Sequence, residues 1–231
     1  MTTYKHLLID LDNTIWDFES NSETALKEIF FSYQLDKQFD SFSHFNNLFS
    51  EGNHQLWAAY CNKQINKKQL NFERFNYPLI LVGIQNETLA LSLGTDYLQI
   101  YPTKTVLMPH ALELLEYLKN KYHLHILSNG FSEVQYTKLK HAKLESYFDK
   151  IILSEMVGVL KPNKRIFEYA IKSLNARKKE TLMIGDNFET DIRGAKDVGI
   201  DQIYYQINAD KELSFTPTYT ITSLLEILKI L

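Results

Sequence analysis

Two pairs of aspartates are the residues of this chain whose type and spacing are best suited to chemistry. Asp10 and Asp12 lie two positions apart at the end of an apolar run, and Asp186 and Asp191 lie five positions apart after another. If the fold gathers all four, they repel, because two like charges about 4 Å apart cost roughly 4 kcal/mol at an effective dielectric of about 20. Such a site needs cations, and we expect Lys161 to supply one.

A divalent metal ion is the other cation that this cluster predicts. Mg²⁺ is bound by a few carboxylates together with waters and the phosphate oxygens of a substrate, which matches the set. Zinc is disfavoured, because the chain has a single cysteine, Cys61, and no Cys/His group at zinc-ligand spacing. The aspartates therefore predict a Mg²⁺ site.

Other polar residues also follow short apolar runs. Ser128, Asn129 and Gly130 end the run at 124–128, and Lys161 follows the run at 151–154. In open parallel sheets, ligands bind in the crevice beyond the carboxyl ends of the strands. We therefore expect segments that are far apart in sequence to converge at one edge of a sheet.

Strand and helix patterns alternate from about residue 103 to the C-terminus. Strands are predicted from apolar runs at 7–11, 124–128, 151–154, 181–185 and 202–207. Helices are predicted from apolar spacing and end signals at 109–118, 164–173 and 190–198, and from 222 or 223 onward. The alternation indicates the α/β class, with a Rossmann-like parallel sheet covered by helices on both faces.

The segment between the first two strands has a different character. It is rich in Phe, Asn, Gln and Lys, and its apolar residues recur at helical spacing, which predicts a bundle of about four helices. We therefore expect a core domain of residues 1–16 and 103–231, and an all-helical cap domain of residues 17–102 inserted after the first strand. Pro102 marks the return to the core.

Composition narrows the classes of partner. The 231 residues carry a formal net charge of −3 and no basic stripe, which argues against binding to a nucleic-acid polymer. No apolar stretch approaches the roughly 20 residues that span a bilayer, so no membrane partner is expected. The N-terminus offers no removable signal, and the single cysteine fits a reducing compartment, so we expect a cytoplasmic protein.

Taken together, the polar segments resemble the four ordered motifs of the haloacid dehalogenase superfamily, and the helical insert resembles its cap. The motifs are Asp-x-Asp-x-Thr at 10–14, Ser128, Lys161-Pro162, and Gly185-Asp186 with Asp191. One such motif alone is weak evidence, but four in order, each after a predicted strand and spread over the whole chain, are specific.

The resemblance implies a role for each acidic residue at the expected site. Asp10 is the nucleophile that attacks phosphorus and forms an aspartyl-phosphate. Asp12 protonates the leaving oxygen and then activates water. Asp10 and Asp186 bind Mg²⁺ through their side chains, and Asp12 contributes its backbone carbonyl.

The remaining motif residues are implied to bind phosphate and to support the site. Ser128 and the backbone N–H groups after it, at Asn129 and Gly130, bind phosphate oxygens, and Lys161 neutralises charge on the nucleophile and the phosphate. Asp191 orients Lys161 or a metal-bound water.

Simpler readings of several residues stay open at this point. Asp12 and Thr14 could shape a turn or cap a helix, and Asp191 could be a solvated helix charge. Asn129 and Gly130 could serve mainly to bend the chain. Asn187 could contact a metal-bound water or belong to a turn.

The residue set favours a phosphatase over a dehalogenase. Cleavage of a carbon–halogen bond needs neither a metal nor a proton for its leaving group, so Asp12 and Asp186 would have no purpose there. A mutase shares the first step, but no feature of the sequence requires a substrate that stays bound to take the phosphate back.

A finer resemblance is to the pyrimidine nucleoside 5′-monophosphate phosphatases, which remove noncanonical nucleotides. It rests on Ser128–Phe131, Gln135, Leu139, Tyr147–Asp149, Ser154–Val159 and Lys161–Phe167. In the cap, aromatic side chains are candidates to stack on a base, although such residues are more often bundle core; these are Trp16, Phe18, Trp57, Tyr60 and Phe72.

The sequence therefore predicts an enzyme that acts on a small phosphate monoester, with a nucleotide as the leading substrate. A sugar-phosphate or phosphoglycolate-type phosphatase of the same fold is the alternative within enzymes. A binding or regulatory module that has lost catalysis is the alternative of another class, and the intact motifs argue against it. The sequence does not indicate an oligomeric state.

Overall fold

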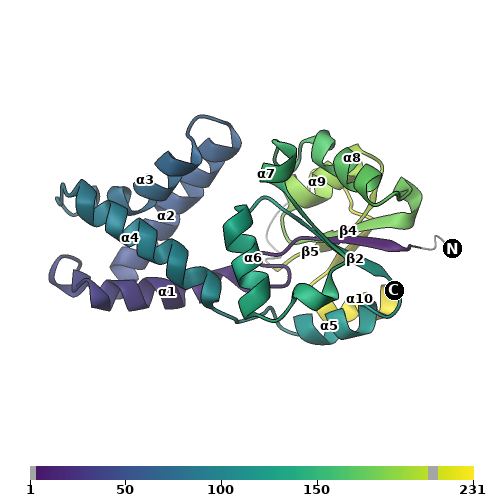
Figure 1. The fold of residues 1–231 in the computed structure, drawn as a ribbon, viewed down its shortest axis with the longest axis horizontal. Coiled ribbons are helices and arrows are strands. Elements are labelled where there is room, and N and C mark those ends of the chain that lie inside the picture. Colours follow the sequence, from purple (N-terminus) through teal and green to yellow (C-terminus); the bar gives the residue numbers. More distant parts are fainter. Residues whose placement is uncertain (1–3, 208–212) are drawn as a thin grey trace. The chain divides into compact units, whose positions relative to one another are not determined.

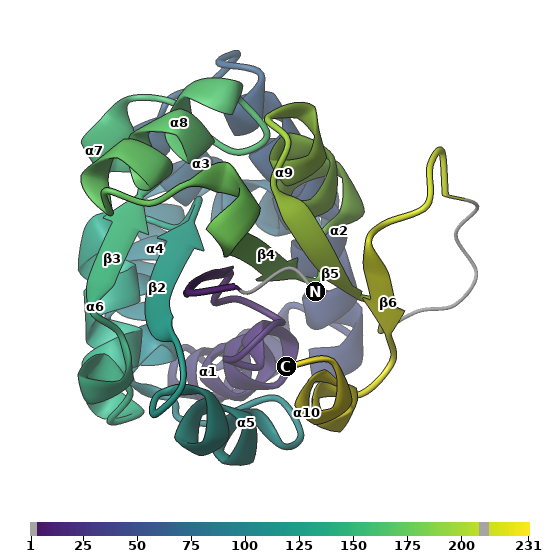
Figure 2. The same ribbon diagram turned by 90° about the vertical axis from the view of Figure 1, so that its right-hand side faces the viewer.

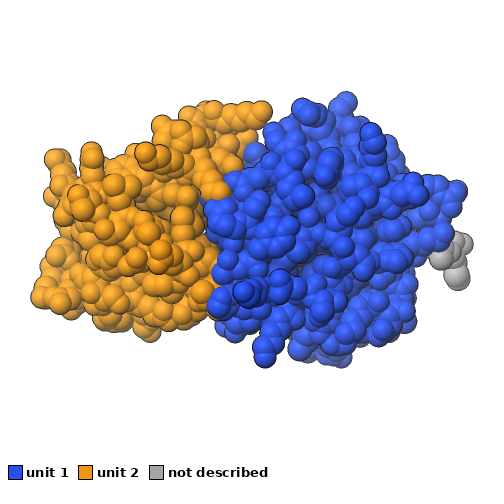
Figure 3. Space-filling view, in the orientation of Figure 1, with its two compact units in different colours: residues 1–18, 105–231 blue, residues 19–104 orange. Residues whose placement is uncertain are grey.

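A computed structural model describes residues 4–207 and 213–231 of the chain. The chain divides into two compact units (Figure 3): unit 1 comprises residues 1–18 and 105–231, and unit 2 comprises residues 19–104. Both junctions fall two residues later than the domain boundaries expected from the sequence.

Unit 1 is built on a parallel sheet of six strands in the order β3-β2-β1-β4-β5-β6, counted over the described residues. Figures 1 and 2 show α8 and α9 over one face of this sheet and α5 and α10 over the other. The strands are β1 (His6–Ile9), β2 (His123–Ser128), β3 (Lys150–Leu153), β4 (Thr181–Gly185), β5 (Asp201–Tyr205) and β6 (Tyr219–Ile221). The predicted α/β class with helices on both faces of a parallel sheet is confirmed.

The central strand sets the level at which the polar segments leave the sheet. β1 lies between β2 and β4, and its Ile9 is in register with Ile126 on one side and Ile184 on the other. The next residue, Asp10, is therefore level with the ends of both neighbouring strands. Leu7, Leu8 and Ile9 are fully buried, as expected for a strand covered on both faces.

Helices of unit 1 connect the strands and cover the sheet. They are α5 (Ala111–Leu118), α6 (Ser132–His141), α7 (Ser154–Val157), α8 (Lys164–Ser173), α9 (Arg193–Asp197) and α10 (Ile227–Ile230). The helix predicted at 164–173 has those bounds in the structure, because Asn163 accepts a hydrogen bond from the N–H of Arg165 and the apolar face of α8 packs on the sheet.

Several elements differ from the sequence-based expectations, and α6 and α7 were not expected from the sequence. The helix predicted at 190–198 is a π-helical turn at Phe188–Ile192 followed by the short α9. The C-terminal helix begins as a 3-10 turn at Leu224–Glu226, which Ser223 caps. Strand β6 was not predicted, because it has three residues and only one of them is buried.

Unit 2 consists of helices packed around aromatic side chains. Its helices are α1 (Phe18–Ser32, of which Phe18 belongs to unit 1), α2 (Phe42–Cys61), α3 (Lys67–Leu81) and α4 (Glu87–Ile100). Phe49, Phe75 and Tyr97 form a cluster with ring centroids 5.1–5.5 Å apart. Ser41, Asn66 and Asn86 cap the N-termini of α2, α3 and α4 through their side chains, which explains where these helices begin.

Within the described residues, every helix is too short or too polar to cross a membrane.

Candidate active site

Polar side chains from four separate segments of unit 1 meet beyond the carboxyl ends of β1, β2 and β4. The central contact is the ion pair between Lys161 and Asp10, whose Nζ and Oδ1 atoms are 2.5 Å apart. The same ammonium group lies 2.7 Å from Oδ1 of Asp191 and donates to the carbonyl of Leu127 at 2.7 Å. The segments at 10, 161 and 191 are thus brought together, as the sequence predicts.

Three carboxylates form a group that is suited to a metal ion. Oxygen atoms of Asp10, Asp186 and Asp191 all lie within 4.8 Å of one another. Burial raises the pKa of Asp10 to about 7, with Asp191 and Asp12 adding to the rise and Lys161 opposing it. Burial, followed by Asp10 and Asp191, also raises the pKa of Asp186 well above its ordinary range.

These raised pKa values are the electrostatic reason to expect a cation. One ammonium group does not balance the buried carboxylates of Asp10 and Asp191 together with the partly buried one of Asp186, so the group favours the binding of another positive charge. Oxygen ligands from carboxylates fit a hard divalent ion such as Mg²⁺. The cluster includes the side chain of Asp191 and not that of Asp12, for which the sequence predicted a backbone contact.

Lys161 is held in place from two sides. Burial by itself would lower its pKa, but Asp10 and Asp191 outweigh burial and raise the pKa above the ordinary value, so the side chain stays charged. The side-chain amide of Asn129 forms two hydrogen bonds with the backbone of Lys161. It accepts from the Lys161 N–H at 2.7 Å and donates to the Lys161 carbonyl at 3.0 Å. The Asn129 side chain therefore positions the lysine.

Thr14, Asn187 and Gly185 support the acidic cluster. Thr14 donates to Oδ1 of Asp186 at 3.2 Å and accepts from its backbone N–H at 3.1 Å. Asn187 Oδ1 accepts from the N–H groups of Glu189 and Thr190, at 3.1 and 3.0 Å, so its side chain caps the turn that begins at residue 188. A Cβ at Gly185 would lie 2.4 Å from Oδ2 of Asp191, so only glycine admits that carboxylate.

Two residues of α6 bind the carboxylate of Asp12. Its Oδ1 lies 2.5 Å from Nζ of Lys138, and its Oδ2 accepts from Nε2 of Gln135 at 2.8 Å. Gln135 also donates to Oγ of Ser128 at 2.7 Å and therefore links Asp12 to the end of β2. A Cβ at Gly130 would lie 2.1 Å from Gln135, which explains the glycine there, and Gly130 itself donates its N–H to Ser128 Oγ at 3.1 Å.

Sequence reasoning missed Lys138 as a residue of the site. It is 1% exposed, and its ammonium group lies 4.3 Å from the centre of the Trp16 ring. In the sequence it is one of several lysines near the end of a helix, where positive charge is ordinary. The available signal was its position three residues after Gln135, on the same face of α6.

One of the aromatic candidates for base stacking is wrong. Trp16 is fully buried in unit 1, where it pairs with Leu107 and lies against Lys138, so its faces are not available to a base. In unit 2, Trp57 and Tyr60 are partly exposed and pack edge to face with ring centroids 5.5 Å apart. Phe72 is also partly exposed.

Comparison with known proteins agrees with this geometry. The family model for haloacid dehalogenase-like hydrolases matches residues 4–199. Pyrimidine 5′-nucleotidase YjjG of Escherichia coli is 29% identical over 227 residues, which cover 97% of this chain and 96% of that protein. Ribulose-1,5-bisphosphate 5-phosphatase of Halopiger xanaduensis is 28% identical over 217 residues, covering 89% of this chain and 86% of the relative.

A solved structure is similar over nearly the whole chain. The magnesium-bound HAD-hydrolase YfnB from Bacillus subtilis has a TM-score of 0.87 and 27% identity, and the match covers 99% of this chain and 98% of that one. The likeness therefore includes both units of the chain.

Proposed function

Because the chain belongs to the haloacid dehalogenase-like hydrolases, we propose that it is a Mg²⁺-dependent phosphatase that works through an aspartyl-phosphate on Asp10. We infer that its substrates are small phosphate monoesters, with pyrimidine nucleoside 5′-monophosphates preferred. The observation that carries the proposal is the group of Asp10, Asp186 and Asp191, in which Lys161 forms ion pairs with Asp10 and Asp191.

The chemistry follows from the contacts of each residue. A carboxylate oxygen of Asp10 attacks phosphorus, the ester bond to the leaving oxygen breaks, and Asp12 gives that oxygen a proton. Asp12 then takes a proton from the water that hydrolyses the aspartyl-phosphate. Lys161, fixed against Asp10, offsets the charge that gathers on the nucleophile and the phosphoryl group.

The metal ion belongs with the carboxylates of Asp10 and Asp186 and the backbone carbonyl of Asp12. When bound, it supplies positive charge to the phosphoryl group. Asp191 acts through Lys161, with which it makes a 2.7 Å ion pair. Ser128 and the backbone at Asn129 and Gly130 complete the phosphate site.

The nucleotide preference rests on similarity to the nucleotidase YjjG over 97% of the chain. Unit 2 is proposed as the substrate-selecting cap, with Trp57, Tyr60 and Phe72 as candidates to stack on a base. The similarity to a ribulose bisphosphate phosphatase over 89% of the chain supports a second candidate function, the hydrolysis of sugar phosphates.

A substrate panel separates these two functions. Purified protein with Mg²⁺ is assayed for phosphate release from pyrimidine and purine nucleoside monophosphates, hexose phosphates and phosphoglycolate. We expect the highest kcat/KM for a pyrimidine nucleotide. A higher value for hexose phosphates or phosphoglycolate than for every pyrimidine nucleotide would replace the first candidate by the second.

The Asp10→Asn variant tests catalysis itself. Asparagine keeps the shape of the side chain but is a poor nucleophile, so we expect phosphate release to fall by at least about 10³-fold with an unchanged circular dichroism spectrum. If wild type and variant both show the same negligible hydrolysis of every ester in the panel, the chain is a binding or regulatory module.

A further inference from the structure

Gln135 is a fully buried amide of α6 to which the proposed chemistry gives no task. None of its surface is exposed. Its Nε2 atom donates to Oδ2 of Asp12 at 2.8 Å and to Oγ of Ser128 at 2.7 Å. An amide nitrogen of this kind carries two hydrogens, so these two bonds use both. One atom of Gln135 therefore joins the aspartate proposed for proton transfer to the serine proposed for phosphate binding.

The carboxylate of Asp12 decides which end of the Gln135 amide faces Ser128. An ionised carboxylate can only accept hydrogen bonds, so the amide presents its nitrogen to Asp12 and not its oxygen. The other oxygen of the same carboxylate forms an ion pair with Lys138 at 2.5 Å. As a result, Oε1 of Gln135 is buried and accepts no hydrogen bond within the part of the chain that the structure describes. A buried acceptor without a donor is costly, so packing alone does not explain this amide.

The hydroxyl group of Ser128 is left with one hydrogen to donate. Its oxygen accepts from Nε2 of Gln135 at 2.7 Å and from the N–H of Gly130 at 3.1 Å, and these two donors occupy both of its lone pairs. Within residues 4–207 and 213–231, the oxygen takes part only in these two hydrogen bonds, and it is the acceptor in both. Asn129 and Gly130 are partly exposed, so the segment after β2 reaches the surface.

We propose that Gln135 is a positioning residue, which holds the Ser128 hydroxyl so that its hydrogen points to the phosphoryl group of the substrate. This inference rests on the proposed function, which places the phosphate beside Ser128. Gly130 belongs to the same arrangement, because a Cβ there would lie 2.1 Å from Nε2 of Gln135. Any side chain at position 130 would therefore push the amide away from the serine.

The test measures the affinity of the full-length protein for inorganic phosphate, by isothermal titration calorimetry in Mg²⁺. The Gln135→Met variant loses both donors but keeps the length of the side chain. Its dissociation constant should rise by about 3- to 10-fold, because the serine hydrogen is no longer held toward the phosphate. The Lys140→Met variant, which places methionine at an exposed position of the same helix, should bind phosphate like wild type.

A double-mutant cycle tests whether Gln135 acts through the Ser128 hydroxyl. The Ser128→Ala variant should bind phosphate at least about tenfold more weakly, because it loses a hydrogen bond to a charged group. Once the hydroxyl is absent, adding Gln135→Met should cause no further loss of affinity, so the two effects are not additive. A merely structural role for Gln135 would instead produce the same loss with and without the hydroxyl.

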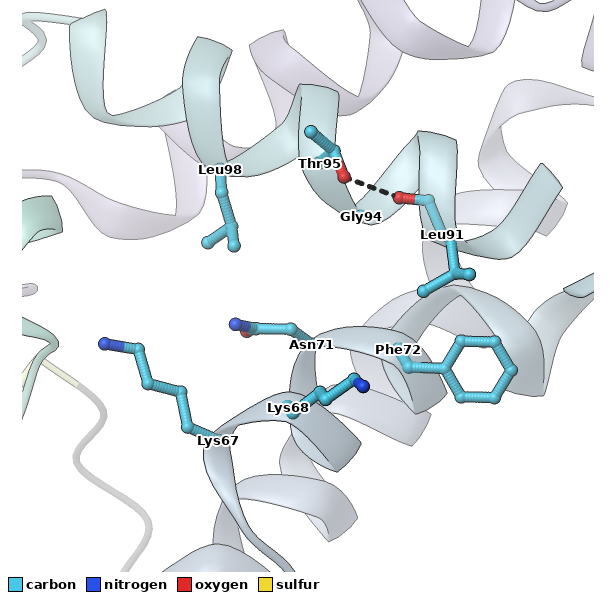
Figure 4. Close-up of a pocket in the computed structure, with 8 residues that line it drawn as sticks. All are labelled: Lys67, Lys68, Asn71, Phe72, Leu91, Gly94, Thr95 and Leu98. Carbon is cyan, nitrogen blue, oxygen red and sulfur yellow. Dashed lines mark hydrogen bonds between the residues drawn. The ribbon is translucent and has the colours of Figure 1, made fainter. Parts of the chain in front are cut away.

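Phosphate bound elsewhere is recognised by a second control. Unit 2 has a groove of about 440 Å³ between α3 and α4, and Figure 4 shows Lys67 and Lys68 beside it. Lys68→Met should leave the dissociation constant unchanged, whereas Ser128→Ala should raise it. The opposite pattern would place the bound phosphate in unit 2 and overturn the proposal.

Gly130→Ala is a second variant, which displaces the Gln135 amide without altering it. It should also weaken phosphate binding, and it replaces Gln135→Met in the cycle if that variant does not fold. The proposal is overturned by equal phosphate affinity in wild type and Gln135→Met, by additive losses in the cycle, or by a wild type that binds no phosphate. None of these measurements needs turnover. If phosphate binds as expected but no ester is hydrolysed, the proposed phosphatase function fails and the role of Gln135 in binding stands.

Discussion

At the scale of single residues, the site depends on which groups touch each carboxylate. Asp10 and Asp12 are two positions apart, yet Asp10 contacts Lys161 and Asp12 contacts Lys138 and Gln135. Each aspartate therefore has its own lysine, from a different segment of the chain. This separation allows one carboxylate to act as a nucleophile while its neighbour is held for proton transfer.

The contact between Lys138 and Asp12 leads to a prediction about leaving groups. Lys138→Met should lower kcat for a nucleotide by about 10- to 100-fold, because Asp12 loses the contact that orients it toward the leaving oxygen. Hydrolysis of p-nitrophenyl phosphate, whose leaving group needs little protonation, should fall much less. Steady-state kinetics on both substrates measures the difference.

The control for this prediction is Lys140→Met, which removes an exposed lysine of the same helix and should leave both rates near wild type. Lys138→Arg should recover part of the loss on the nucleotide. An equal loss on both substrates would mean that Lys138 supports the fold of the site and not the orientation of Asp12.

At the scale of elements, the strands place reactive groups at one end and histidines at the other. His6 and His123 are the first residues of β1 and β2, and His125 lies further along β2. Nδ1 of His6 and Nε2 of His125 are 3.2 Å apart, and the His6 and His123 rings stack with centroids 5.2 Å apart. Asp149 contacts His123 at 2.7 Å, so His125 has no carboxylate of its own among the described residues.

This histidine cluster predicts acid sensitivity. Burial lowers the pKa of His125 to about 4, with His6 adding to the effect, and burial also lowers the pKa of His6. A base whose pKa is lower in the folded state contributes stability that is present above about pH 6.5 and is lost as pH falls toward 4. The loss from His125 should be at most about 3 kcal/mol.

Urea unfolding of wild type and His125→Gln at pH 7 and pH 4.5 measures the predicted loss of stability. Glutamine at position 125 cannot take up the proton that the histidine side chain binds at low pH. The free energy of unfolding should fall by less in the variant than in wild type between the two pH values. The exposed His110 serves as the control, because His110→Gln should keep the full wild-type dependence. Identical pH dependence in wild type and His125→Gln would exclude His125 as a source of the acid sensitivity.

At the scale of the whole molecule, the parallel sheet concentrates negative charge at one edge. Asp10, Asp186 and Asp191 come from segments that are up to 181 residues apart, and the fold holds them within 4.8 Å. In the metal-free protein, the ionised forms of Asp10 and Asp186 reduce stability, because both pKa values are raised. The stability that their protonated forms contribute is present at low pH. The part from Asp10 is lost as pH rises through about 7, and the part from Asp186 is lost as pH rises through its own raised pKa.

Mg²⁺ should reverse that loss. Differential scanning calorimetry should show a higher melting temperature with Mg²⁺, with a gain of about 2.7 kcal/mol at 100 times the dissociation constant. The gain should be larger at pH 8 than at pH 6, because protons compete with the metal for Asp10. The Asp186→Asn variant should lose most of this gain in stability. The Asp197→Asn variant, which changes an exposed residue of the same unit, should keep the gain. Equal gains in all three proteins would place the bound Mg²⁺ elsewhere.

The sequence by itself determined five of the strands, several of the helices and the identity of most motif residues. Apolar runs gave β4 with its final bounds, and apolar spacing gave α8 with its final bounds. These features are local: a buried strand or an amphipathic helix is encoded within a few successive residues. The convergence of the motif segments also follows from the sequence. Each segment comes after a strand, and parallel strands place their carboxyl ends at one edge of the sheet.

Only the tertiary structure decided which side chains meet. Lys138 contacts Asp12 across 126 positions, and Arg74 is buried against a helix that begins 13 residues after it, yet the sequence analysis singled out neither residue. The residues of strand β6, Tyr-Thr-Ile, favour a strand, but three residues are too few to predict one, and pairing with β5 is what fixes it. Periodicity records which face of an element is apolar, but partners far apart in sequence are set by packing, which local patterns do not encode.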